Sequence, residues 1–195
     1  MMRIAVIAGS TRPKRRARMV ADWVTEVARR HIAGSEVRVD LVDLADVDLP
    51  LLDEPVAAAH GLYEHEHTRR WAETIRSYEG FVIVTPEYNH SVPAALKNAI
   101  DYLYAEWSNK AVGFVGYGLN GGVRAIEHLR LIVAELEMAD VRSHVLLSLF
   151  GDFELADTIE PGVLKPGDHQ EATLTRLVDE VVAWSGALRP LREQN

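Results

Sequence analysis

The chain has 195 residues and a formal net charge of -8 at pH 7, from 29 acidic and 21 basic residues. That length suits one domain with a sizeable core, and an acidic chain without a basic block excludes the broad electrostatic footprint of a nucleic-acid-binding protein. No cysteine is present, which excludes disulfides, thiolate nucleophiles and cysteine metal sites, so any redox chemistry must come from a bound cofactor. We also expect a cytoplasmic protein without membrane contact, because no apolar run approaches membrane-spanning length and the amino terminus lacks the features of a signal peptide.

The first predicted elements form a strand, helix, strand unit. Ile4–Ala8 is a short apolar run that predicts a buried strand, and Ala17–Ile32 has its apolar residues on one helical face. Glu36–Leu41 alternates weakly and predicts a second strand, joined by a right-handed crossover. Prolines interrupt Val42–Tyr63, which we expect to be a long surface connection with Leu49–Leu52 packed against the body of the domain.

The middle of the chain predicts a buried strand that leads into a helix. After a helix expected at Glu66–Tyr78, the run Phe81–Val84 is wholly apolar and rich in β-branched residues, as in strands buried on both faces. A loop follows, in which we expect Ser91 to cap a helix that has Pro93 in its first turn and continues to Leu103. The loop therefore lies at the carboxyl end of a strand, where open α/β sheets bind ligands.

The remaining elements continue the alternation of strands and helices. We expect strands at Ala111–Val115 and Val145–Phe150, a helix between them at Gly122–Leu136, a loop at Gly151–His169 and a closing helix at Ala172–Leu188. Regular alternation predicts a parallel sheet covered on both faces by helices, a three-layer α/β sandwich. The pattern alone does not distinguish between the possible strand orders of such a sheet.

Several stretches together resemble one family. The segment TPEYNHSVPAALKNAIDYL at Thr85–Leu103, together with Gly9–Arg12, Asp48–Pro55 and Gly116–Gly122, resembles the NADPH-dependent FMN reductases, flavodoxin-like quinone, azo-dye and metal-ion reductases. The resemblance implies a single flavodoxin-like domain over residues 1–195, with a five-stranded parallel sheet in the order 2-1-3-4-5. Small departures from the family pattern occur within the long segment, at His90 and Ala94.

The first candidate loop, Gly9–Arg18, carries arginines at the start of a helix. Cations are disfavoured there by the helix dipole, so their presence indicates an anion bound to the exposed N–H groups, although a solvated basic helix start is the alternative. The resemblance implies that Ser10, Thr11 and Arg12 hold the FMN phosphate. Many relatives have hydroxyl and amide side chains a few residues further on, so we hypothesise that Arg15 replaces a lost contact by a charge-assisted fork.

The second candidate loop is Thr85–Ser91. Backbone groups of Pro86, Glu87, Tyr88 and Asn89 are placed to face the edge of a flat heterocycle, with the Tyr88 ring packed beside it. An ordinary turn with a half-buried aromatic residue is the alternative.

The third candidate loop contains GYGLNG, a literal match to the G-x-G-x-x-G dinucleotide motif. It belongs to the fourth strand and helix unit, however, and no acidic residue follows at the required spacing, so we do not interpret it as a dinucleotide site. The resemblance implies that Gly116, Tyr117, Gly118 and Gly121 line the flavin instead. Tyr117 stands where many relatives have a small residue, which narrows the site.

Two other groups of residues point to no site. Three histidines interleaved with glutamates between His60 and His67 fit no zinc motif and are typical of a solvated helix entry. Ser10 and Ser91 lie outside any G-x-S-x-G sequence, so a hydrolase is poorly supported.

The function expected from the resemblance is an FMN-dependent NAD(P)H oxidoreductase. Hydride would pass from NADPH, or NADH, to FMN and on to a quinone-like or other small acceptor in a ping-pong cycle, with no protein side chain as general acid or base. The alternative is a non-enzymatic flavodoxin-like electron carrier or interaction module. The resemblance also implies a homodimer or homotetramer, in which Tyr104 and Trp107 lie either at the interface or in the core.

Overall fold

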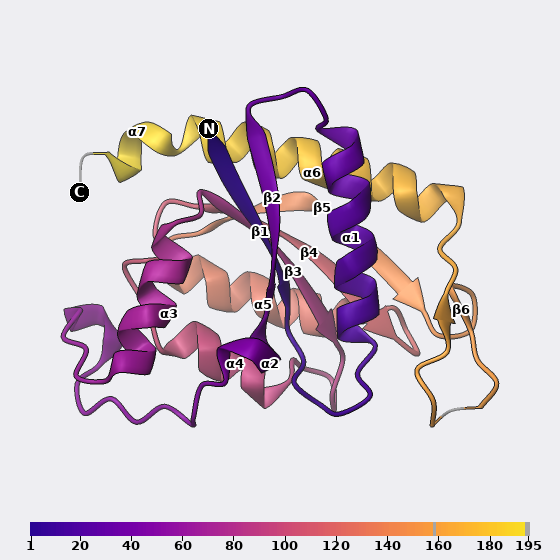
Figure 1. The fold of residues 1–195 in the computed structure, drawn as a ribbon, viewed down its shortest axis with the longest axis horizontal. Coiled ribbons are helices and arrows are strands. Elements are labelled where there is room, and N and C mark those ends of the chain that lie inside the picture. The colour runs from indigo at the N-terminus through magenta and orange to yellow at the C-terminus, as the bar shows by residue number, and fades with distance from the viewer. Residues whose placement is uncertain (158, 194–195) are drawn as a thin grey trace.

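The computed structural model describes residues 1–157 and 159–193 and contains one central parallel sheet (Figure 1). Its strand order is β2-β1-β3-β4-β5, which confirms the expected 2-1-3-4-5 order. The strands are β1 Met2–Ala8, β2 Val37–Asp43, β3 Gly80–Pro86, β4 Ala111–Gly118 and β5 Ala139–Ser148. All neighbouring pairs in this sheet are parallel, so their carboxyl ends share one edge.

Helices cover both faces of the sheet, and the expected three-layer sandwich is therefore confirmed (Figure 1). One face packs against α1 (Ala17–His31) and α6 (Asp168–Ala187), and the other against α3 (Glu66–Arg76), α4 (Ala94–Asp101) and α5 (Val123–Glu135). No helix among the described residues combines the length and the apolar character needed to cross a membrane.

The central strand shows why these apolar runs form a doubly covered sheet. Successive side chains point to opposite faces, so Val82 and Val84 join the core under α1 and α6, whereas Phe81 and Ile83 join the core under α3, α4 and α5. All are at most 1% exposed. Trp107 lies in the second core at 1% exposure, 5.0 Å from the Phe81 ring centroid, so it is a core residue.

The last strand and the segment after it differ from the prediction. β5 spans Ala139–Ser148, whereas Val145–Phe150 was expected. The prediction began too late because the amino-terminal half of β5 is polar and lies at the edge of the sheet, where apolar periodicity is weak. The expected loop at Gly151–His169 contains a short antiparallel hairpin of β6 (Phe153–Glu154) and β7 (Val163–Leu164), and α6 already begins at Asp168. The chain also forms the short elements α2 Leu44–Val47, η1 Ala58–His60 and α7 Arg189–Arg192.

The start of α4 corrects the prediction of a serine cap. Pro93 occupies the cap position, and no side chain there forms a capping hydrogen bond. Ser91 instead pairs with Tyr88 through both backbone groups, at 2.9 and 3.0 Å, and its Oγ lies 3.0 Å from His128 Nδ1. The Ser91 hydroxyl that was expected to cap the helix is therefore paired with His128 instead.

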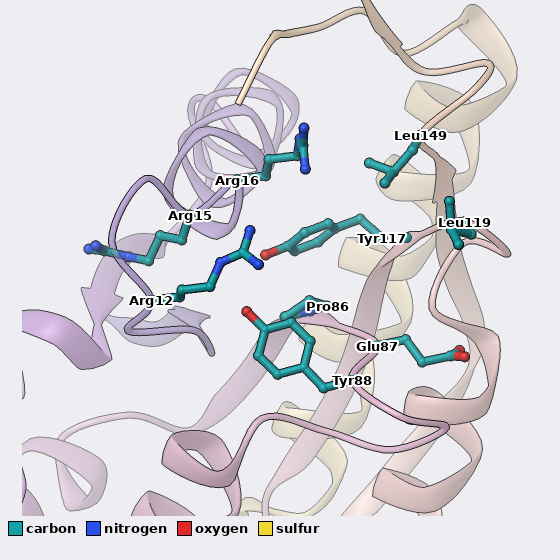
Figure 2. A pocket seen from close by; sticks show the side chains of 10 residues that line it. Arg12, Arg15, Arg16, Pro86, Glu87, Tyr88, Tyr117, Leu119 and Leu149 are labelled. Carbon is teal, nitrogen blue, oxygen red and sulfur yellow. The ribbon is translucent and has the colours of Figure 1, made fainter. Parts of the chain in front are cut away.

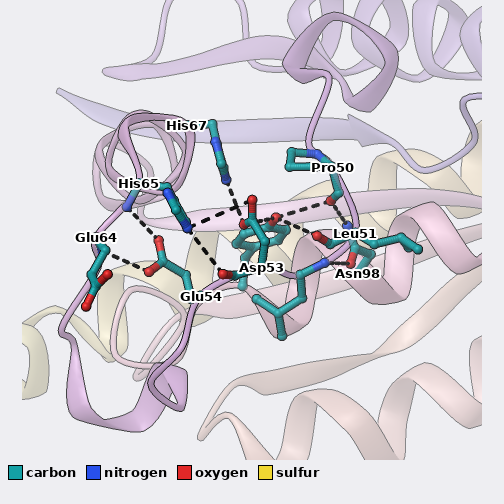
Figure 3. Close-up of polar contacts among 10 residues, drawn as sticks. Pro50, Leu51, Asp53, Glu54, Glu64, His65, His67 and Asn98 are labelled. Carbon is teal, nitrogen blue, oxygen red and sulfur yellow. Dashed lines mark hydrogen bonds and ion pairs between the residues drawn. The ribbon is translucent and has the colours of Figure 1, made fainter.

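The connection before α3 is held by polar contacts (Figure 3) and by Leu49, which packs against the second core as expected. Asp53 accepts a hydrogen bond from the Tyr102 hydroxyl at 2.9 Å, and its carboxylate lies 2.9 Å from His67 Nε2. The Asn98 amide donates to Pro50 O at 2.7 Å, but Leu51 is 81% exposed, so the expected packing of the Leu49–Leu52 side chains is wrong for Leu51. Among the described residues, no group of three or more His, Cys, Asp or Glu side chains is arranged to hold a metal ion.

Candidate functional site

A cavity of about 240 Å³ lies where the loops after β1, β3 and β4 meet, at the carboxyl ends of adjacent strands (Figure 2). Each of the three candidate loops contributes to its wall, and the segment after β5 contributes Leu149. The lining residues are Arg12, Arg15, Arg16, Pro86, Glu87, Tyr88, Tyr117, Gly118, Leu119 and Leu149. The topology therefore brings together segments that are more than one hundred residues apart in the sequence.

The first loop passes close to β3 before it enters α1. A Cβ at Gly9 would lie 2.8 Å from Val84 O, so only glycine allows this approach. Ser10 is buried, and its Oγ lies 3.2 Å from the Tyr88 hydroxyl, which joins the first and second loops. Arg16 is the cap residue of α1 and forms no side-chain capping bond, so the N–H groups of the first turn are left for a ligand or water.

The arginines of this loop have different environments. The Arg12 guanidinium points into the cavity, with Cζ 5.9 Å from the Tyr88 ring centroid (Figure 2). Arg15 instead donates to Asp43 Oδ2 at 2.7 Å, and its guanidinium is turned away from the cavity (Figure 2). Asp43 is buried, so water does not screen its attraction to Arg15 as it would at the surface. Arg12 has no carboxylate partner among the described residues and is the arginine of this loop best placed to meet an anion in the cavity.

Arg16, which was not among the predicted site residues, ties a distant segment to the site. Its guanidinium donates to Glu160 O at 2.7 Å and to Pro161 O at 2.8 Å. Lys14 adds an ion pair with the Glu160 carboxylate at 2.6 Å. These contacts hold the segment between β6 and β7, which we call the strap (residues 155–157 and 159–162), beside the start of α1. The run of basic residues was the only sequence signal for this contact, and it gave no partner.

In the second loop, Glu87 supports the third loop and α5 instead of entering the cavity. Its carboxylate accepts a hydrogen bond from the Arg124 backbone N–H at 3.1 Å and also pairs with the Arg124 guanidinium. The Glu87 side chain is 9% exposed and points away from Tyr88 (Figure 2). A carboxylate at the first turn of α5 complements the helix dipole, so Glu87 fixes the geometry of the second loop relative to α5.

The glycines of the third loop allow the chain to fold tightly on itself. A Cβ at Gly116 would lie 2.5 Å from Gly121 O, so Gly116 and Gly121 shape the loop without lining the cavity. Gly118 does line it. In the other two loops, the predicted residues that do not line the cavity are Ser10, Thr11 and Asn89.

Tyr117 is the most buried polar group directed into the cavity. The residue is 6% exposed, and its hydroxyl points toward the Arg12 guanidinium (Figure 2). On its other side the ring centroid is 6.5 Å from that of Phe153 in β6. Burial, reinforced by Tyr88, raises the pKa of Tyr117, so the phenol stays protonated at neutral pH and remains a hydrogen-bond donor.

Comparisons with known proteins identify relatives in sequence. Residues 2–152 match the family described as NADPH-dependent FMN reductase. The chain is 36% identical over 172 residues to an NAD(P)H-dependent FMN reductase of Nectria sp, covering 84% of each chain. It is 36% identical over 142 residues to a quinone reductase of Pseudomonas putida, covering 69% of this chain and 71% of the relative.

A solved structure shows the same fold. It is the flavoenzyme NAD(P)H:(acceptor) oxidoreductase of Paracoccus denitrificans, with a TM-score of 0.69 and 21% sequence identity. The match covers 96% of this chain and 98% of that one.

Proposed function

The chain belongs to the NADPH-dependent FMN reductase family, and on that premise we propose that it is an FMN-dependent NAD(P)H oxidoreductase with a small electron acceptor. The observation that carries this proposal is the convergence of the Arg12 guanidinium, the Tyr117 hydroxyl and the uncapped start of α1 on one cavity. A cation, a neutral donor and free backbone N–H groups together suit a phosphate.

We place the phosphate end of FMN at the first loop. Ser10, Thr11 and Arg12 would hold the phosphate there, and Tyr117 would donate a further hydrogen bond from the opposite wall. The cavity is smaller than the usual range of roughly 300–1,000 Å³ for pockets that enclose a drug-sized ligand. It therefore suits one end of the cofactor, with the remainder lying along the open side.

The flavin ring would lie against the second and third loops. Backbone groups of Pro86–Asn89 would contact its polar edge, the Tyr88 ring would pack beside it, and Gly118 would allow close approach of the backbone. In this arrangement Glu87 acts through Arg124, by fixing the loop that carries these groups. Arg15 would reach the phosphate only by leaving Asp43.

When bound, FMN supplies the redox chemistry, taking hydride from NADPH or NADH and reducing the acceptor. We propose a ping-pong cycle in which donor and acceptor use the same open side of the site in turn. The protein side chains bind and orient the cofactor, and none is assigned as general acid or base. A quinone is the acceptor class that the quinone reductase relative supports.

We propose that the protein is a homodimer or homotetramer. Leu51 and Phe150 are both 81% exposed in the single chain, and large exposed apolar side chains support association. Light scattering coupled to size-exclusion chromatography tests this directly, and a monomer at micromolar concentration would contradict it.

The visible spectrum of the FMN-reconstituted protein, recorded without oxygen before and after addition of NADPH, tests the proposed function. We expect the bound flavin to bleach promptly and to recover its colour when a quinone is added. Flavin that binds but does not bleach would instead support the electron-carrier alternative. If no flavin binds, the site at the three loops is wrong.

A further inference from the structure

Lys110 is a buried amine at the end of the sheet opposite the candidate site. It directly precedes β4 and is 5% exposed. Its Nζ donates one hydrogen bond to Ile75 O at 2.8 Å and lies 5.6 Å from the Phe81 ring centroid. The proposed flavin chemistry makes no use of this group.

A second cavity, of about 430 Å³, has Lys110 in its wall. Basic and acidic side chains from the neighbouring helices and loops line it together with Lys110. The lining residues are Arg76, Tyr78, Glu79, Ala105, Glu106, Ser108, Asn109, Lys110 and Arg192. A buried nitrogen at the wall of a cavity of this size can be reached by a small electrophile without unfolding.

The charges around the cavity are distributed unevenly. Arg76 pairs with Glu106 at 2.7 Å and Arg192 pairs with Glu79 at 2.9 Å, so both carboxylates already have arginine partners. Lys110 has no carboxylate within ion-pair distance among the described residues. Burial, followed by the nearby Arg192, lowers the pKa of Lys110 to about 7, so much of the amine is neutral under physiological conditions.

The other lysines provide a contrast within the same chain. Lys14 and Lys97 are exposed and each lies 2.6 Å from a carboxylate, and Lys165 also pairs with one. A carboxylate partner favours the protonated form of an amine, which has no lone pair for attack. Lys110 thus combines burial, a cavity and the absence of such a partner within the described part of the chain.

We propose that Lys110 is a carbamylation site for carbon dioxide. The lone pair of the neutral Nζ attacks the carbon of CO₂, a new N–C bond forms, and one C=O π pair moves onto oxygen. The nitrogen then releases one proton to water, so the amine and CO₂ give a carbamate anion and H⁺ without any change of oxidation state.

The surroundings favour CO₂ over larger electrophiles and favour its product. CO₂ is small and uncharged, so it can enter the cavity without disturbing the ion pairs. The product has a negative charge at a position where Arg76 and Arg192 disfavour a positive one. Glu79 and Glu106 oppose this charge, but each is partly neutralised by its arginine, and Tyr63 also donates to Glu106 at 2.8 Å.

The test is to equilibrate the protein at pH 8 with ¹³C-labelled bicarbonate, trap carbamates with an ethylating reagent, and map the label by peptide mass spectrometry. We expect the label on Lys110 to exceed that on Lys97 by at least tenfold, and to decrease as the pH is lowered to 6 and the amine becomes protonated. Label at the amino-terminal amine serves as an internal positive control. Absence of label on Lys110 while the amino terminus is labelled would overturn the proposal.

Two lysine-to-arginine variants, which remove the reactive amine, complete the test. In ¹³C NMR spectra, Lys110→Arg should lose one carbamate resonance that Lys97→Arg retains, with circular dichroism confirming that both are folded. If both variants keep every resonance, the amine that reacts is not Lys110, and the proposal is wrong. Peptide mapping of the wild-type protein decides the question even if Lys110→Arg does not fold.

Discussion

Arginines at the two ends of the sheet differ in whether they have a carboxylate partner. At the amino ends of the strands, Arg76 and Arg192 pair with the carboxylates of Glu106 and Glu79. At the carboxyl ends, Arg12 points into a cavity with no carboxylate partner among the described residues (Figure 2). A charge that only stabilises a fold is paired within the fold, whereas a charge left without a partner at the edge of a cavity is available to a ligand.

The first test breaks the Arg76–Glu106 ion pair at the amino ends of the strands. Glu106→Ala removes a buried carboxylate that accepts hydrogen bonds from Tyr63 and Arg76. We expect the free energy of unfolding, measured by urea denaturation, to fall by about 1–2 kcal/mol, since the Tyr63 hydroxyl loses its acceptor while the exposed Arg76 guanidinium stays solvated. FMN affinity of the folded fraction should not change.

The exposed Glu73 on α3 is the matched control, because it forms no ion pair within the described part of the chain. Glu73→Ala should change the free energy of unfolding by less than about 0.5 kcal/mol. If Glu106→Ala were equally mild, the paired charges at this end would contribute little to stability and the contrast between the two ends would fail.

The second test removes Arg12, which has no carboxylate partner in the described part of the chain. Arg12→Ala should weaken FMN binding at least about tenfold, because a hydrogen bond to a charged group contributes about 1.5–3 kcal/mol. Stability should be nearly unchanged. Titration of flavin fluorescence measures the affinity, and riboflavin, which lacks the phosphate, should bind both proteins equally.

Arg18→Ala is the control for this variant, because Arg18 lies nearby in α1 but pairs with carboxylates, with Asp22 at 3.0 Å and with Asp43 at 3.6 Å. Its FMN affinity should stay within about twofold of the wild-type value, as expected for an exposed pair. An equal loss of affinity in both variants would mean that the net positive charge of the loop, and not the position of Arg12, holds the cofactor.

The third test uses the pH dependence of stability. The folded-state pKa of Lys110, about 7, lies below its ordinary value of 10.5. Between these pH values the unfolded chain binds more protons, so wild-type stability rises with pH in this range. We expect Lys110→Met to be more stable than the wild type by about 1–2 kcal/mol at pH 6 and to lose this advantage by pH 9. A stability difference between the two proteins that does not change with pH would show that burial does not lower the pKa of Lys110.

The sequence predicted those parts of the molecule that depend on local pattern. The run Phe81–Val84 identified β3 to within a few residues, and the adjacent loop contains Tyr88, which lines the cavity. The partners of Glu87 and Arg15 were not predictable, because Arg124 and Asp43 lie on other elements, 37 and 28 residues away. Long-range pairing leaves no local periodicity to detect.

The strap and the amino-terminal half of β5 were missed for a related reason. β5 lies at the edge of the sheet, so its polar residues face solvent and dilute the apolar pattern. The strap is held by two backbone carbonyls that accept from Arg16, and carbonyl groups are common to every residue. Neither feature has a distinctive composition.

A smaller effect on FMN affinity is expected from removing the Tyr117 hydroxyl, the neutral hydrogen-bond donor in the cavity. Tyr117→Phe removes one hydroxyl from a ring that remains packed against Phe153. We expect about a fivefold loss of FMN affinity, corresponding to a hydrogen bond of about 1 kcal/mol, and no loss for riboflavin. Tyr104→Phe, whose hydroxyl bonds Glu135 O away from the cavity, is the control and should bind as the wild type. An equal loss for both flavins would place the Tyr117 hydroxyl at the ring or ribityl chain.

Arg15 provides the smallest expected effect and the sharpest comparison with Arg12. The two residues share one loop, but the Arg15 guanidinium is held by the buried Asp43 carboxylate. If Arg15 moved to the phosphate, the buried Asp43 carboxylate would lose its closest positive partner. We therefore expect Arg15→Ala to change FMN affinity less than threefold while lowering stability, and Asp43→Asn to lower stability in the same way. If Arg15→Ala instead weakened FMN binding tenfold or more, and Asp43→Asn strengthened it, the phosphate would compete with Asp43 for this arginine. Arg15 would then be a second phosphate contact.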